Sequence, residues 1–178
     1  PKGPDRHYLA AGIMAARSTD QTAFVLVDTR THEFLALDVP TKERPGIAVV
    51  APPSKAPAFV HGENRKALRT ITAALRAGPF PHLESVRDIE HRHLDLAVSA
   101  VEKSDRPFLT YLITENARVQ RMVAAIQRRD WQMLGALLLI SHRSRMAGLA
   151  LEDPAADLIV SEVENLSMEG MYGATRLN

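Results

Sequence analysis

The side chains that could carry chemistry in this chain are histidines, arginines and one serine–histidine pair. His91 and His93 lie two residues apart in the stretch EHRH. Residues two apart on a helix point in different directions, whereas residues four apart share a face and can hold one metal ion. We therefore predict that these histidines lie on a solvated helix face and bind no metal.

A group of arginines in the second half of the sequence could bind phosphate. The group consists of Arg118, Arg121, Arg128, Arg129, Arg143 and Arg145. Acids at Glu115 and Asp130 interleave with these cations in the sequence, so an ordinary charged helix surface is the better interpretation.

Ser141 and His142 are adjacent and could belong to a nucleophilic site. They lie in the middle of a predicted apolar helix, with Trp131, Leu134 and Leu138 nearby on its face. We predict a buried, hydrogen-bonded polar pair, because buried polar groups in proteins are nearly always paired. The sequence has no P-loop, no GxGxxG fingerprint and no nucleophile elbow, so its local motifs alone identify no catalyst.

The sheet that would support these helices is predicted near the start of the chain. Residues 22–39 are rich in β-branched and aromatic residues and are interrupted by polar turn formers at 28–32, which predicts an antiparallel hairpin. GIAVVAPP at 46–53 is typical of a third, buried strand that ends at two prolines. We expect strands at 24–29, 33–39 and 47–51, and a further short strand or strand entry near the last residues, GMYGATRLN.

From residue 64 onward the pattern is helical. A first helix is predicted over 64–77, ending at a Gly-Pro pair, and a capping box at Ser85 to Asp88 is expected to open a second helix reaching about Glu102. Further helices should begin near Ser104 to Pro107, after Asp130 and after Asp153, which precedes a proline at the first helical position. The whole predicts one α+β domain over 1–178, with helices packed on one face of a small antiparallel sheet.

Composition narrows the class of protein. The 178 residues suffice for one domain or for a large part of a two-part enzyme. The 22 basic and 21 acidic residues give a formal charge of +1, and there is no cysteine. We therefore expect no nucleic-acid partner, no disulfide framework and no cysteine-ligated zinc. The apolar runs are too short to span a bilayer, so we expect no membrane partner and a soluble, cytoplasmic protein.

Several segments, taken together and in order, carry a resemblance to a known family. They are AGIMAA, VDTRTHEFLALDVP, GIAVVAPPS, ENRKA, VRDI, TENARV, RRDWQMLGALLLISHRS, DPAADLIV and GMYGATRLN. This series resembles the C-terminal portion of galactokinases, which belong to the GHMP small-molecule kinases. TENARV followed by DW…G…SH…S and GMYGAT is the specific combination. The resemblance implies a GHMP C-terminal-domain-like fold, a monosaccharide substrate, and ATP and Mg²⁺ as cofactors.

The resemblance also implies which residues would face the sugar. Gly12 and Met14 stand in the segment that reads GIMDQ in the family. Asn64 and Arg65 match the family's Asn-x-Arg, and Glu63 stands where the family has a sugar-contacting Tyr. A polar helix N-terminus is a sufficient structural explanation for Asn64 and Arg65, so both interpretations remain open.

Ala15 stands at the position of the family's catalytic Asp. That Asp is proposed to act as a base toward the sugar's anomeric hydroxyl, or to orient it electrostatically, and a methyl group can do neither. We expect Ala15 to face the same cleft as Glu63 and Asn64, and Glu63 is the possible substitute for the missing carboxylate.

The resemblance leaves two function classes open. The family's phosphate-binding loop precedes the GIM segment, and its glycine-rich loop follows GMYGAT. We therefore expect this chain to be the C-terminal part of a longer protein and to be inactive without the nucleotide-binding half. The longer protein would be an ATP-dependent sugar kinase or, alternatively, a non-catalytic sugar-binding or regulatory relative.

Overall fold

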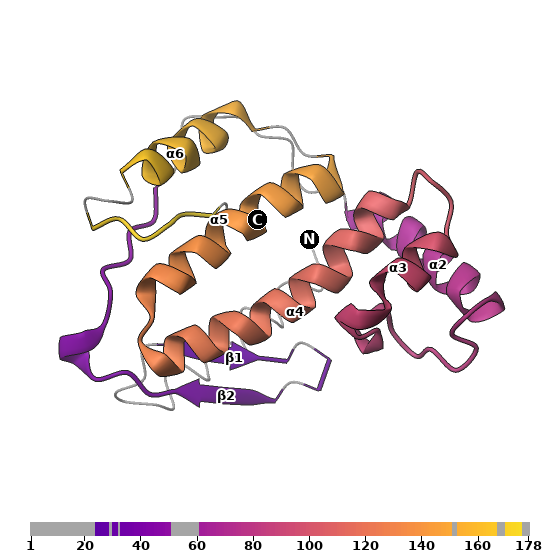
Figure 1. Cartoon of the computed structure of the whole chain (residues 1–178), viewed down its shortest axis with the longest axis horizontal. Helices are drawn as coiled ribbons and strands as arrows, with labels where there is room; N and C mark the ends of the chain where they lie inside the picture. Colours follow the sequence, from indigo (N-terminus) through magenta and orange to yellow (C-terminus); the bar gives the residue numbers. More distant parts are fainter. Residues whose placement is uncertain are drawn as a thin grey trace.

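The computed structural model describes residues 24–28, 30–31, 33–50, 61–150, 153–166 and 170–175, with backbone alone described for 61–63. Within this part, a two-stranded antiparallel sheet and five α-helices form an α+β fold (Figure 1). The predicted fold class is confirmed. No helix in the described ranges has the length and apolar character needed to cross a bilayer.

The predicted hairpin is present. Strand β1 (Phe24–Val27) pairs with β2 (Phe34–Leu37), with Phe24 opposite Leu37 and Val27 opposite Phe34. The Asp28 carboxylate accepts the backbone N–H groups of Arg30, at 2.7 Å, and Thr31, at 3.3 Å. An aspartate that bonds to the backbone just beyond itself favours a turn, so this residue helps to reverse the chain.

The predicted third strand is wrong over 46–50. This stretch forms no strand, and Ile47, Val49 and Val50 are 73%, 78% and 63% exposed. Residues 51–53 of the same prediction lie outside the described residues. β-branched side chains favour extended backbone, but a strand also requires a neighbour for its N–H and C=O groups, and no described segment supplies one.

Helix α2 (His61–Ala77) confirms the predicted first helix and begins three residues earlier. Ile71 and Leu75 are completely buried, and the helix gives way to a turn at Gly78 and Pro79. These two side chains form a core with nine buried members. The others are Leu83, Val86, Ile89, Ala97, Val101, Leu109 and Ile113.

The capping box predicted at Ser85 is confirmed, but the long helix after it is not. The Ser85 hydroxyl accepts the backbone N–H of Arg87, and the Asp88 carboxylate accepts the N–H of Ser85. The box opens only a short 3-10 helix, η2 (Val86–Asp88). Ile89 then adopts extended backbone, so that Val86 and Ile89 are both buried in the core.

Two short elements complete this region. They are a second 3-10 helix, η3 (His91–His93), and α3 (Leu94–Ser99). His91 and His93 therefore lie on a 3-10 turn and not on the expected α-helix. His91 is exposed, and the ring of His93 packs edge-on against Phe80 with centroids 6.1 Å apart.

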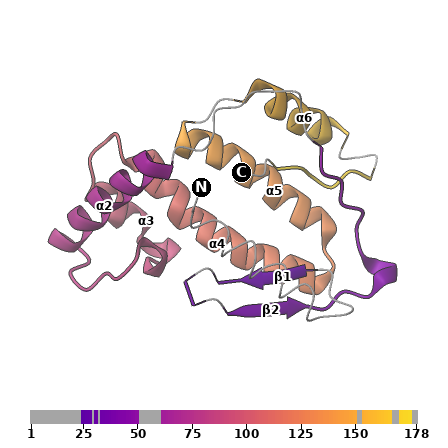
Figure 2. The same cartoon turned by 180° about the vertical axis from the view of Figure 1, so that it is seen from behind.

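Three longer helices form the rest of the fold: α4 (Arg106–Arg128), α5 (Trp131–Leu149) and α6 (Pro154–Asn165). Both predicted caps are confirmed. The Asp130 carboxylate accepts the N–H of Met133 at 2.9 Å, and that of Asp153 accepts the N–H of Ala156 at 3.2 Å. Figure 2 shows α4 running past α2 and α3 at one end and past the hairpin at the other.

The second half of α4 contributes to a smaller core beneath the hairpin. Buried Leu37 and Val39 meet Ile126 of α4 there, and Trp131 of α5 packs against this cluster. The Trp131 ring stacks on Phe24, with centroids 6.0 Å apart and planes 24° apart. Trp131 is partly buried. Helix α4 joins the two cores, because it contributes Ile113 to the first and Ile126 to the second.

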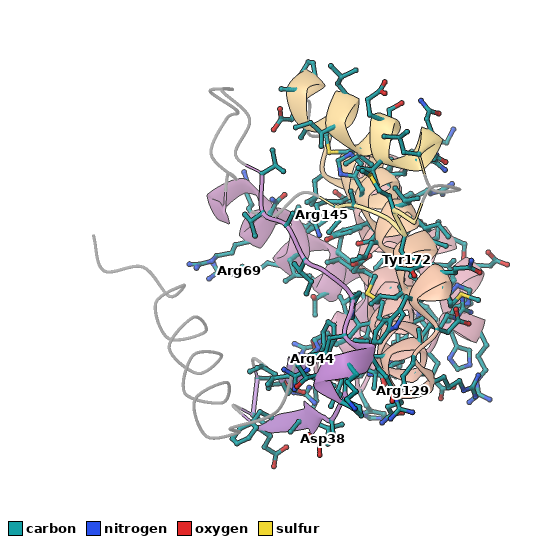
Figure 3. The ribbon with its side chains drawn as sticks, turned by 90° about the vertical axis from the view of Figure 1, so that its left-hand side faces the viewer. Asp38, Arg44, Arg69, Arg129, Arg145 and Tyr172 are labelled. Atoms are coloured by element: carbon teal, nitrogen blue, oxygen red, sulfur yellow. The ribbon has the colours of Figure 1, made fainter. Side chains whose placement is uncertain are left out.

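The segment 170–175 crosses α5 closely and forms no strand, so the predicted last strand is wrong in the described part. A Cβ atom on Gly135 would lie 1.8 Å from the carbonyl oxygen of Tyr172, and one on Gly173 would lie 2.2 Å from that of Gly135. Figure 3 shows Tyr172 lying against α5. Gly170 has a φ of 92°. Glycine adopts this positive φ without strain, and the missing side chains of Gly135 and Gly173 allow the two segments to approach closely.

Candidate functional site

The resemblance assigns the sugar to two segments, of which the structure describes the side chains of one pair, Asn64 and Arg65. Gly12, Met14 and Ala15 lie outside the described residues, as does the side chain of Glu63. Asn64 and Arg65 lie near the N-terminus of α2, where Asn64 is half-buried and Arg65 is exposed. The expected cleft between the GIM segment and α2 therefore stays a prediction.

The TENARV and SH segments meet inside the molecule. Ser141 of α5 donates its hydroxyl hydrogen to Glu115 of α4 at 2.6 Å, and the guanidinium of Arg118 pairs with the same carboxylate. Arg118 and Ser141 are buried. An arginine is buried at low free-energy cost only when it is paired, so Glu115 neutralises Arg118 and anchors Ser141.

His142 connects α5 to α6. Its Nε2 atom lies 2.9 Å from the Oδ1 atom of Asp157, in the DPAADLIV segment. His142 is only 4% exposed, and its Nδ1 atom has no hydrogen-bond partner within the described residues. A second pair, Arg143 with Glu164, joins the same two helices at the exposed surface.

This arrangement holds helices together and does not form a nucleophilic site. A serine nucleophile needs a base within hydrogen-bond reach, and the partner of Ser141 is Glu115, whose carboxylate already bonds to Arg118. The partner of His142 is Asp157. The prediction of a buried, hydrogen-bonded Ser141–His142 pair is confirmed.

A second polar cluster, here called the hairpin junction, joins the hairpin turn to η2. The Arg87 guanidinium bonds to both oxygens of the Asp28 carboxylate, at 3.2 and 3.1 Å. In the opposite sense, Arg30 bonds to Asp88 at 3.2 Å. Asn116 of α4 donates to the backbone carbonyl of Arg87 at 3.1 Å. The VDTR, VRDI and TENARV segments thus converge at one place.

Electrostatics at the hairpin junction favour ionised Asp28. The backbone N–H of Arg30 and the side chain of Arg87 lower the pKa of Asp28 from 3.8 to about 2. Hydrogen bonds and positive charge both stabilise the carboxylate form, so the group stays charged well below neutral pH. Asp28 therefore acts here as a fixed anion and not as a proton donor.

The arginine group does not form one surface. Arg129 pairs with Glu43 and Arg143 with Glu164 at the exposed surface, which agrees with the predicted charged helix surface. For Arg118 that prediction is wrong, because the residue is buried with Glu115. Within the described ranges, no group of three acidic or histidine side chains could hold a metal ion.

Sequence reasoning missed the roles of Glu115 and Asp157. Glu115 lies three residues after Leu112 on α4, and Asp157 follows Ala156 in an apolar segment. An acid inserted in the apolar stripe of a helix is the available signal for a buried polar contact. Asp28 and Arg87 offered no such signal, since they are 59 positions apart.

Part of the chain is similar in sequence to galactokinases. The chain is 30% identical to galactokinase from Streptomyces coelicolor over 80 residues, which is 44% of this chain and 21% of that enzyme. It is 29% identical to galactokinase from Streptomyces lividans over 80 residues, 44% of this chain and 20% of the enzyme. Human galactokinase is 29% identical over 91 residues, 51% of this chain and 23% of the enzyme.

These matches support a galactokinase-like relationship. No protein-family model matches the chain. The aligned part is less than a quarter of the length of each curated relative.

Proposed function

We propose that this chain forms the C-terminal part of a galactokinase-like, ATP-dependent sugar kinase, which transfers a phosphoryl group to a monosaccharide hydroxyl. The similarity to three galactokinases carries this proposal. The aligned stretch is a small part of each relative, so the nucleotide-binding half would be supplied by the longer protein. ATP and Mg²⁺ are then the implied cofactors.

The chemistry of phosphoryl transfer indicates what this chain and the nucleotide-binding half would each contribute. Catalysis of that reaction depends on positioning and on neutralising charge around the γ-phosphate. The described part of this chain supplies buried cores and interlocked helices, which suit a scaffold. We propose that Gly12, Met14, Glu63, Asn64 and Arg65 face the sugar, and that the chain alone is inactive.

Ala15 favours a second candidate, a non-catalytic sugar-binding or regulatory protein. A methyl group at the family's Asp position provides no general base, and such a base typically contributes about 10²–10⁴ in rate. Glu63 would have to supply a carboxylate to the same hydroxyl for the kinase proposal to hold at full rate.

The test is isothermal titration of the full-length protein with ATP–Mg²⁺ and with a panel of monosaccharides, together with a measurement of sugar phosphate formed. Binding of both ligands with product formation supports the kinase. Sugar binding without turnover supports the second candidate, and absence of both contradicts the galactokinase-like proposal.

A further inference from the structure

We propose that a pocket between residues 87–91 and helix α4 binds a neutral, hydroxyl-rich small molecule of about monosaccharide size. The pocket has a volume of about 220 Å³. Water occupies about 30 Å³ per molecule in the liquid, so the pocket has room for roughly seven water molecules. This is smaller than the pockets of about 300–1,000 Å³ that hold drug-sized ligands.

The pocket has an apolar floor and a polar rim. Ile89 and Ile113 are buried at its base, next to half-buried Ala117. Polar side chains from η2, η3, the segment between them and α4 surround this floor. They are Arg87, Asp88, Glu90, His91, Asn116 and Gln120. Apolar surface with a few converging polar groups is the usual composition of a small-molecule site, and it suits a sugar ring, which has apolar C–H faces and a polar edge.

The charges of the rim are already balanced by neighbours. Arg87 bonds to Asp28, Asp88 bonds to Arg30, and Glu90 pairs with Arg92 at 3.0 Å. An ionic ligand would have to compete with these ion pairs. A neutral ligand can use the remaining hydrogen-bonding capacity without disturbing them, so the pocket favours uncharged polar groups.

The uncharged side chains of the rim retain donors and acceptors that are free to bond to a ligand. In the described part of the chain, the side chains of His91 and Gln120 have no hydrogen-bond partner, and Asn116 uses one amide hydrogen on the Arg87 carbonyl. Amides and neutral imidazole each offer a donor and an acceptor. Hydroxyl groups also donate and accept, so a polyol can both donate hydrogen bonds to these side chains and accept hydrogen bonds from them.

Asn64 and Arg65, the two sugar-assigned residues whose side chains the structure describes, do not line this pocket. The inference does not rest on the proposed kinase function. It concerns a pocket that Asn64 and Arg65 do not line, and it needs no nucleotide. Its failure and the failure of the proposed function are therefore separate results.

The experiment is a titration of the isotope-labelled 178-residue chain with D-galactose, D-glucose, D-mannose and myo-inositol, followed by NMR. We expect saturable shifts of the side-chain amide signals of Asn116 and Gln120 for at least one of these probes. One neutral hydrogen bond contributes about 0.5–1.5 kcal/mol, so Gln120→Ala and His91→Ala should each weaken that binding about 2- to 12-fold.

Gln132→Ala is the matched control, because Gln132 is also exposed but lies on α5, outside the pocket. It should leave the binding unchanged. The inference is overturned if none of the four probes gives saturable shifts, if both pocket variants bind like wild type, or if inorganic phosphate binds there more tightly than the sugars.

Discussion

Replacement of Gly135 by alanine tests the close crossing of segment 170–175 over α5. Gly135 lies inside α5, where alanine is favoured over glycine by about 1 kcal/mol. Helix propensity alone would therefore make the variant more stable. The added Cβ atom, however, would lie 1.8 Å from the Tyr172 carbonyl oxygen and 2.1 Å from its carbonyl carbon.

The steric term should be the larger of the two. Overpacking costs typically about 1–3 kcal/mol, and the upper end applies because the obstructing atoms belong to backbone and not to a flexible side chain. Subtracting the helix gain of about 1 kcal/mol leaves a net loss of about 2 kcal/mol. For a chain of this size that corresponds to a fall in Tm of roughly 4–8 °C.

The assay is thermal and urea unfolding followed by circular dichroism. Gly46→Ala is the matched control, because a Cβ atom there would meet no atom within 4 Å. Its Tm should stay close to that of wild type. A Gly135→Ala variant as stable as wild type, or more stable, would refute the reasoning that this glycine is required by the crossing.

Three further predictions concern the polar contacts. Asp157→Ala should lower the free energy of unfolding by about 1–3 kcal/mol, because it leaves His142 buried without a partner. Glu164→Ala breaks an exposed ion pair on the same helix and should lower it by less than about 1 kcal/mol. Urea unfolding measures both variants, and equal effects would contradict the account. The pKa of Asp28 is lowered, so its contribution to stability is complete above pH 3.8 and is lost as the pH falls toward about 2. The free energy of unfolding of Asp28→Asn should therefore depend less steeply on pH in this window than that of wild type. The same pH dependence in both proteins would exclude a stabilising role of the Asp28 carboxylate. Ser85→Ala should cost about 1 kcal/mol through loss of the capping box, measured by thermal unfolding, and a Tm equal to that of wild type would show that the cap contributes nothing.

Local signals in the sequence were sufficient for the hairpin and the long helices. Asp130 and Asp153 cap helices as the sequence predicts, and the turn begins at Asp28, the first of the polar turn formers at 28–32. Each of these features depends on residues within about four positions of one another. Such contacts form in the same way whatever the rest of the chain does.

Features that depend on distant partners were not predictable in the same way. The stretch 46–50 has strand-forming residues but no described neighbour to pair with. Arg118 resembles a surface arginine in the sequence, and only the packing of α5 against α4 buries it. The Asp28–Arg87 contact joins residues 59 positions apart. The candidate sugar site was predicted from resemblance alone, and only Asn64 and Arg65 can be placed with their side chains.

The central proposal is tested most directly by restoring the family's acid in the full-length protein. The measurement is the rate of galactose phosphorylation by wild type and by Ala15→Asp, with ATP–Mg²⁺. General-base assistance is worth about 10²–10⁴ in rate, so the account predicts a gain of up to that size, smaller where Glu63 already supplies a carboxylate. No detectable phosphorylation by either protein would contradict the kinase proposal for galactose and favour a sugar-binding or regulatory protein.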